Sequence, residues 1–330
     1  MVDRPLVSRS RVRRPVFVVA LAIVTGLALL VPAGAAAALA AKPGDGFEKS
    51  LIRVVRNDQF IDTAPAGVVS LGDSYSSGLG AGSYDDDCDR TPQAWGMLIF
   101  ADEVSREDRL LLACSGAVVD DVYDQLDDLA EAGPSGGRLI TLTVGGNDIG
   151  FAGELASCFV PFVGCAGRET TLMNRIDALV DPLTELYVDV QAANPGDVLI
   201  VGGYPLLVPD PEVRSSCRAL TPLLSTAERE MIRRLGVALN QAIEEAASAA
   251  GVRSAGAQLE AVFDGHEACA NGPDDWLNGL KLGSGSQEPD PDAPETRWDA
   301  FASFVRESFH PNVAGQAGYA DAFTTVWGTH

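Results

Sequence analysis

Five short apolar runs recur along the chain, and each is closed by glycine. They are GVVSL, RLLLACSG, RLITLTVGGND, DVLIVGGYP and VRSAGA, at residues 67–71, 109–116, 138–148, 197–205 and 252–257. Runs of this length, rich in Leu, Ile and Val, are typical of parallel strands that are buried on both faces of a sheet. No other feature of the sequence restricts the fold as much.

Stretches with helical periodicity separate these runs. They lie at residues 92–104, 119–132, 172–193 and 225–250. Strands and helices that alternate in this way predict an α/β fold, a three-layer α/β/α sandwich around a mostly parallel sheet. Because no internal repeat and no second domain boundary is visible, we expect one domain over residues 67–330, preceded by a polar lead-in at residues 41–66.

The first forty residues have the order of a secretory signal. Five arginines lie among the first fourteen residues, an apolar run spans residues 16–31, and an alanine-rich stretch follows. The alanines at positions 38 and 40 fit an A-x-A cleavage site, so we expect residues 1–40 to be a signal peptide, removed near Ala40 from a secreted protein. A retained anchor is the alternative, although the run is short for a span of about 20 residues.

The chain is strongly acidic. It has 24 Lys and Arg against 46 Asp and Glu, a formal charge of -22. A nucleic-acid binder needs a basic surface to neutralise phosphates, so nucleic acid is excluded as a partner. The same charge disfavours anionic membrane surfaces. We therefore expect a solvated monomer with no stable membrane insertion after cleavage of the signal.

All six cysteines lie downstream of the export signal, which favours disulfides. Six cysteines allow fifteen pairings, and we expect the sequential one, which joins Cys88 to Cys114, Cys158 to Cys165 and Cys217 to Cys269. No metal site is expected, because the chain has no CxxC and only three histidines. The acidic run at residues 85–87 could bind calcium, but it lacks the EF-hand pattern and is more simply a solvated loop.

Polar or glycine residues follow the first three strands, at the edge where doubly wound sheets bind ligands. Ser74 follows the first in GDSYSSG, Gly116 closes the second in CSGA, and Asn147 follows the third in GGND. A serine at a strand-to-helix turn can be a nucleophile when a base is in reach. The backbone N–H groups of Ser74 and Gly116 and the amide of Asn147 could together form an oxyanion hole.

The base must come from three histidines, His266, His310 and His330. Only His310, in FHPN, stands at a turn that leads into a helix. Each of these residues also has a structural interpretation. Ser74 could be a helix N-cap, and Gly116 and Asn147 could be turn residues.

Taken together, GDSYSSG, CSGA, GGND and FHPN resemble the four blocks of the SGNH (GDSL-type) hydrolase family. The resemblance spans residue 67 to about residue 325 and is closest to secreted actinobacterial lipases and esterases, several of which have three sequential disulfides. It implies the SGNH hydrolase fold with a flavodoxin-like sheet, and a site that needs no cofactor. Ser74 would be the nucleophile, His310 the base, and Ser74, Gly116 and Asn147 the oxyanion hole.

One position departs from the family pattern. The family usually has Asp three residues before the histidine, where this chain has Glu307. We expect Glu307 to orient His310, and a backbone carbonyl is the alternative.

The resemblance predicts a secreted serine carboxylester hydrolase, a lipase or esterase, that cleaves small-molecule or lipid esters through an acyl-enzyme. The alternatives are a carbohydrate acetyl esterase or a phospholipase of the same fold, or a non-catalytic binding protein. A lipase of the α/β-hydrolase type is set aside, because the one GxSxG match, GPSGG at residues 133–137, precedes a predicted strand, whereas the nucleophile turn of that fold follows one.

Overall fold

The computed structural model describes residues 63–133, 136–151, 165–217, 224–281 and 306–328, together with Glu154 and Cys158. All of these belong to the unit Asp58–His330. The expected signal peptide and its cleavage site near Ala40 lie outside the described residues. Within the described ranges, no helix is long and apolar enough to cross a membrane.

The centre of the fold is a five-stranded sheet in the order β2-β1-β3-β4-β5, with every pair of neighbours parallel. The strands are β1 (Val68–Gly72), β2 (Arg109–Leu111), β3 (Leu139–Thr143), β4 (Val198–Val201) and β5 (Arg253–Ser254). This is the flavodoxin-like order of a doubly wound sheet. The five apolar runs are therefore confirmed as strands; β1 has the length of its run, shifted by one residue, and the other four strands are shorter than their runs.

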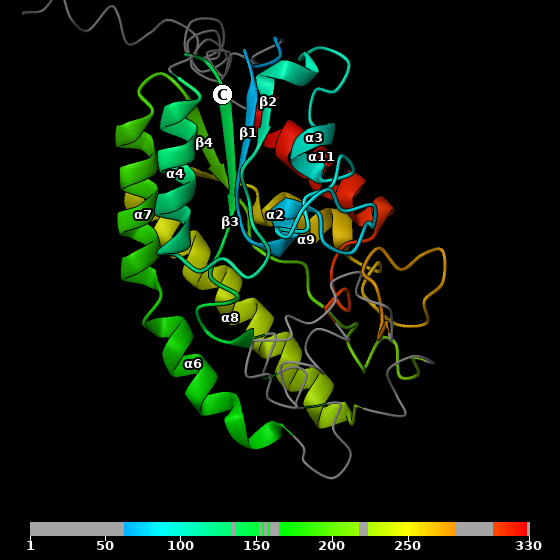
Figure 1. The fold of residues 1–330 in the computed structure, drawn as a ribbon. Coiled ribbons are helices and arrows are strands. Elements are labelled where there is room, and N and C mark those ends of the chain that lie inside the picture. Colours follow the sequence, from blue (N-terminus) through cyan, green and yellow to red (C-terminus); the bar gives the residue numbers. More distant parts are fainter. Residues whose placement is uncertain are drawn as a thin grey trace, which may run out of the picture. The chain divides into compact units, whose positions relative to one another are not determined.

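Helices cover both faces of the sheet (Figure 1). One layer consists of α4 (Asp121–Glu131), α6 (Glu169–Asp177), α7 (Val180–Ala193) and α8 (Thr226–Ala250). The other layer consists of α3 (Trp95–Leu98), α9 (Gly256–Phe263) and α11 (Val313–Gly328). Three further single turns are α2 (Ser74–Ser77), η2 (Arg106–Asp108) and η3 (Ala166–Arg168). The predicted three-layer sandwich is confirmed.

The bounds of some predicted elements are wrong. The helix predicted over residues 92–104 is a single turn, α3, because Ile99 leaves the helical conformation with a ψ of 124° and Phe100 follows with a φ of 49°. The helix predicted over residues 172–193 is divided at Ala178 into α6 and α7. Only two residues of the run at 252–257 pair in the sheet, since Gly256 already begins α9.

Helix α8 shows how local sequence fixes a boundary. Ser225 caps it in a capping box with Glu228, and Gly251 ends it in the left-handed conformation. Between these ends, the buried side chains include Leu235, Leu239 and Ile243, which recur at helical spacing.

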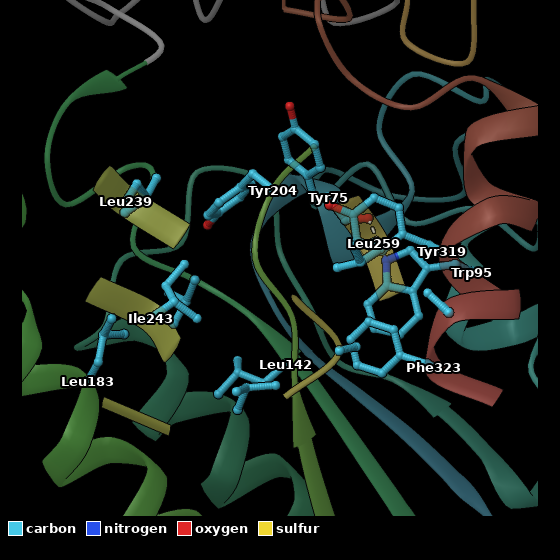
Figure 2. Packing of buried hydrophobic residues seen from close by; sticks show 14 of the residues in the cluster. Tyr75, Trp95, Leu142, Leu183, Tyr204, Leu239, Ile243, Leu259, Tyr319 and Phe323 are labelled. Carbon is cyan, nitrogen blue, oxygen red and sulfur yellow. Dashed lines mark hydrogen bonds between the residues drawn. The ribbon is translucent and has the colours of Figure 1, made fainter. Parts of the chain in front are cut away.

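Aromatic side chains form the core between the sheet and the layer of α3 and α11 (Figure 2). Trp95 stacks on Phe323 with ring centroids 4.3 Å apart and on Tyr319 at 5.6 Å. The indole N–H of Trp95 donates to the Tyr75 carbonyl at 2.9 Å. The aromatic core is therefore bonded directly to the backbone of the turn that carries Ser74.

Three disulfides join Cys88 to Cys114, Cys158 to Cys165 and Cys217 to Cys269. This is the sequential pairing that we expected. The first bridge joins Cys88, in the loop after α2, to Cys114, the first residue of the block CSGA after β2.

Candidate active site

The nucleophile turn begins where β1 ends. Gly72 has a φ of 114°, and a Cβ at this position would lie 2.0 Å from the carbonyl oxygen of Thr143, so only glycine fits. Asp73 caps the following turn by accepting from the Tyr75 N–H at 3.1 Å. Ser74 is the first residue of α2, and within the described residues its N–H has no hydrogen-bond acceptor.

The structure brings Ser74 and His310 together across 236 residues of sequence. Ser74 Oγ lies 2.8 Å from His310 Nε2. Nδ1 of His310 lies 3.1 Å from the carbonyl oxygen of Ser308. Because a carbonyl oxygen can only accept, Nδ1 must carry the ring proton, and Nε2 is left free to accept from the Ser74 hydroxyl.

The peptide before His310 is held from two sides. Tyr75 donates its hydroxyl to the Phe309 carbonyl at 2.7 Å, and its ring lies 4.9 Å from the imidazole. Phe309 has a φ of 63°, an uncommon conformation for this residue. Asn278 stabilises it, since its carbonyl accepts from the Phe309 N–H and its own N–H donates to the His310 carbonyl.

Glu307 does not contact the imidazole. Its Oε1 accepts from the Tyr84 hydroxyl at 2.8 Å, and its Oε2 lies 3.1 Å from Lys281 Nζ. Burial raises the pKa of Glu307, but these two partners and the charge of Arg306 together outweigh burial and lower the pKa on balance. The Ser308 carbonyl lies beside His310 Nδ1, where we expected the Glu307 carboxylate. The arrangement therefore corresponds to the alternative in which a backbone carbonyl orients the histidine.

The surroundings of His310 keep the ring neutral. Burial lowers the pKa of His310 to about 4, while the Ser308 and Arg306 carbonyls and the charge of Glu307 act in the opposite direction. At neutral pH the imidazole is therefore unprotonated and can take a proton from Ser74.

The Gly116 and Asn147 blocks lie against each other at the carboxyl edge of the sheet. The Cys114 N–H donates to the Gly72 carbonyl at 2.9 Å, which joins the segment after β2 to the nucleophile turn. One N–H of the Asn147 amide donates to the Ala117 carbonyl at 2.9 Å. An amide nitrogen carries two hydrogens, so the second remains for a ligand. Within the described residues, the Gly116 N–H also has no acceptor.

Two buried polar side chains at this edge were missed from the sequence. Gln125 in α4 accepts from the Gly72 N–H at 2.7 Å and donates to the Gly72 carbonyl at 2.9 Å. Tyr204, after β4, places its hydroxyl 2.5 Å from Asp73 Oδ2. Tyr204 follows Gly202 and Gly203 at the end of a predicted strand, so the strand-end rule that selected Ser74 would also have found it.

The acidic run at residues 85–87 is the place where the sequence suggested a cation. In the part of the chain that the structure describes, no group of three or more His, Cys, Asp or Glu residues is placed to hold a metal ion. In the acidic run at residues 85–87, Asp86 accepts from the Cys88 N–H and forms an ion pair with Arg90. The carboxylate of Asp86 therefore stabilises the loop in which it lies.

Comparison with known proteins decides the family. The sequence profile of the GDSL-like lipase/acylhydrolase family matches residues 70–317. The chain belongs to this family. The predicted resemblance to the SGNH (GDSL-type) hydrolases is thereby confirmed, and the protein is a carboxylic-ester hydrolase.

Streptomyces proteins are among the relatives of this GDSL-like hydrolase. It is 32% identical to Lipase 1 of Streptomyces coelicolor, over 77% of this chain and 84% of that protein. The crystal structure of phospholipase A1 from Streptomyces albidoflavus NA297 matches 80% of this chain and 100% of its own, with 33% identity and a TM-score of 0.64. The extracellular lipase of Streptomyces rimosus matches 78% of this chain and 98% of its own, with 29% identity and a TM-score of 0.62.

Proposed function

We propose that this hydrolase is a secreted serine esterase or lipase in which Ser74 and His310 act as a catalytic dyad. The observation that carries the proposal is the 2.8 Å contact between Ser74 Oγ and His310 Nε2, with the ring proton held on Nδ1 by the Ser308 carbonyl. A hydroxyl in contact with a neutral imidazole is the arrangement that activates a serine nucleophile.

In the acylation step, His310 Nε2 takes the hydroxyl proton as Ser74 Oγ bonds to the ester carbonyl carbon. The carbonyl electron pair moves onto oxygen, and three donors stabilise this oxyanion: the N–H groups of Ser74 and Gly116 and the free N–H of the Asn147 amide. When the carbon–oxygen bond of the ester breaks, the imidazolium gives its proton to the leaving alkoxide. The products of this step are an alcohol and an acyl-Ser74 ester.

In the deacylation step, a water molecule attacks the acyl-enzyme and His310 accepts its proton. The same three donors stabilise the second oxyanion. Collapse of this intermediate releases the carboxylic acid and returns the proton to Ser74. The Ser308 carbonyl stabilises the imidazolium in both steps, and the negative charge of Glu307 does so through space.

Secretion rests on three observations. The N-terminal order of arginines, apolar run and alanines fits a signal peptide. The three disulfides fit an oxidising compartment. The related Streptomyces rimosus lipase is extracellular. Sequencing of the N-terminus of protein recovered from culture medium tests this, and a start near Ala41 is expected.

A phospholipase is the second candidate, because the match to phospholipase A1 covers the whole of that chain. Since the protein carries a formal charge of -22, neutral or zwitterionic lipid is a better target than an anionic bilayer. Rates on p-nitrophenyl esters from acetyl to palmitoyl, with phosphatidylcholine vesicles alongside, distinguish an esterase, a lipase and a phospholipase.

The test of the nucleophile is Ser74→Ala, with Ser77→Ala as its control. Ser77 is a neighbouring buried serine in the same turn, and its hydroxyl donates to the Ser74 carbonyl. Ser74→Ala should lower kcat by at least about 10³-fold and abolish labelling by a fluorophosphonate, while Ser77→Ala should keep both. Turnover by Ser74→Ala close to that of the wild type would refute the mechanism.

A further inference from the structure

Tyr204 lies outside the four sequence blocks, yet its hydroxyl joins two of them. It is 2.5 Å from Oδ2 of Asp73, the residue before Ser74. It also accepts from the N–H of Gly146, the residue before Asn147, at 3.1 Å. We propose that Tyr204 is a positioning residue that fixes the Asn147 oxyanion donor relative to the Ser74 nucleophile. This inference rests on the proposed function.

The direction of each hydrogen bond follows from the groups involved. The Gly146 N–H can only donate, so the Tyr204 oxygen accepts there and must direct its single proton to Asp73. Asp73 accepts on its other oxygen from the Tyr75 N–H and from Thr143 Oγ1. One continuous chain of hydrogen bonds therefore runs from the oxyanion segment to the nucleophile turn.

Tyr204 is itself held rigidly. Its backbone N–H donates to Asn240 Oδ1 at 2.8 Å, and Asn240 Nδ2 donates to its carbonyl at 2.7 Å. Its ring packs edge-to-face on Tyr75 with centroids 4.9 Å apart (Figure 2). The side chain is 8% exposed. A buried residue with these constraints can act as a fixed reference for two loops.

The carboxyl group of Asp73 is buried, and its pKa reflects both this burial and its hydrogen bonds. Burial raises its pKa to about 6, and the hydrogen bonds from Tyr204, Thr143 and the Tyr75 N–H limit that increase. At pH 8 the carboxylate is therefore ionised and holds all three donors. Loss of the Tyr204 hydroxyl would leave the Gly146 N–H without its acceptor, and that peptide would be free to turn.

A shifted oxyanion donor costs turnover more than binding. The oxyanion exists only in the transition state and the intermediates, so an error in the position of Asn147 lowers kcat and leaves KM nearly unchanged. Removal of such a donor costs about 10²–10³-fold, and displacement by about 1 Å costs up to about 10²-fold. Tyr204→Phe should therefore lower kcat by about 10- to 100-fold, with KM within about twofold of the wild type.

Tyr319→Phe is the matched control. Tyr319 is fully buried, and its hydroxyl donates to the Gly203 carbonyl, next to Tyr204 in the chain. The Tyr319→Phe variant therefore loses a buried tyrosine hydroxyl that is bonded to neither Asp73 nor Gly146. Tyr319→Phe should keep kcat within about threefold. An equal loss of kcat in both variants would assign the effect to packing and overturn the proposal.

A double-mutant cycle with Asn147→Ala separates positioning from a general structural effect. If Tyr204 acts through Asn147, Tyr204→Phe should change kcat by less than about threefold once Asn147 is alanine. A full 10- to 100-fold loss in that background would contradict the proposal, as would an unchanged kcat for Tyr204→Phe alone.

If Tyr204→Phe does not fold, Asn240→Ala, which removes both side-chain hydrogen bonds to the Tyr204 backbone, tests the same positioning. It should lower kcat and lose that effect once Asn147 is alanine, and additive effects would overturn the proposal. Ser74→Ala is measured in parallel. Turnover retained by Ser74→Ala refutes the dyad itself, whereas its loss together with an unaffected Tyr204→Phe refutes only the role of Tyr204.

Discussion

The carbonyl oxygen of Ser308 lies 3.1 Å from Nδ1 of His310, in the position that a carboxylate takes in a Ser-His-Asp triad. The Glu307 carboxylate, one residue away, is bound instead by Tyr84 and Lys281. The imidazole is thus oriented by the backbone that precedes it. The charge of Glu307 reaches the ring only through space.

This relationship predicts that Glu307→Ala is far milder than His310→Ala. The loss of His310 removes the base and should lower kcat by at least about 10³-fold, whereas the loss of Glu307 should cost less than about tenfold. Steady-state rates on p-nitrophenyl butyrate measure both. Glu307→Gln, which keeps the side-chain length, is the control for packing. Equal losses in Glu307→Ala and His310→Ala would show that Glu307 is part of the triad after all.

The buried imidazole predicts an activity that persists at acidic pH. His310 must be neutral to act as a base, and burial lowers its pKa to about 4. Since kcat/KM reports the free enzyme, its loss through protonation of His310 should come only near pH 4. Asp73, which caps the nucleophile turn, has a pKa of about 6, so the profile is measured in Asp73→Asn as well as in the wild type. Circular dichroism at each pH controls for unfolding. A decline centred near 6.5, the ordinary pKa of histidine, that persists in Asp73→Asn would contradict the prediction.

The fold could be predicted from the sequence because buried parallel strands carry their signal locally. Each run is apolar on both faces and is closed by a glycine, as at Gly72 and Gly145, which both have φ values above 110°. The prediction of a helix over residues 92–104 was wrong, because contacts with residues far away in the sequence contribute to the conformation of this segment. The Trp95 N–H donates to the side chain of Gln316, 221 residues away. No local pattern reports such a contact.

In the candidate site too, some residues could be predicted from the sequence and others could not. The strand-end rule predicted that Ser74 and Asn147 would lie at one edge of the sheet, because it depends only on strand order. The direction of the Glu307 side chain was not predictable, since it is decided by Tyr84, 223 residues away, and by Lys281. Gln125 was not found for a similar reason, because a polar residue on a helix is ordinarily solvated.

Gln125 is expected to stabilise the nucleophile turn. Its amide satisfies both backbone groups of Gly72, two residues before Ser74, and it is 5% exposed. In Gln125→Leu the Gly72 N–H loses its acceptor, which should lower the free energy of unfolding by about 1–3 kcal/mol. The turn would also loosen, so kcat should fall by several-fold. Urea unfolding and steady-state kinetics measure the two effects.

Thr141→Val is the control for Gln125→Leu. Thr141 is fully buried on β3 and donates to the Val69 carbonyl, away from the edge that carries Ser74. Its loss should cost about 1 kcal/mol of stability and leave kcat within about twofold. If both variants lower kcat equally, the effect belongs to the stability of the sheet and not to the turn.

The three disulfides should stabilise the fold unequally, in the order of the loops that they close. Their cysteines are 52, 26 and 7 residues apart, for the bridges at Cys217, Cys114 and Cys165 respectively. Cross-linking restricts the unfolded chain more when the loop is longer, which gives about 4 kcal/mol for the longest and about 2 kcal/mol for the shortest. Paired Cys→Ser variants of each bridge, compared by urea unfolding, measure these values. If the shortest bridge contributed most, the stabilisation would arise in the folded state, where the bridge holds its surroundings, and not in the unfolded chain.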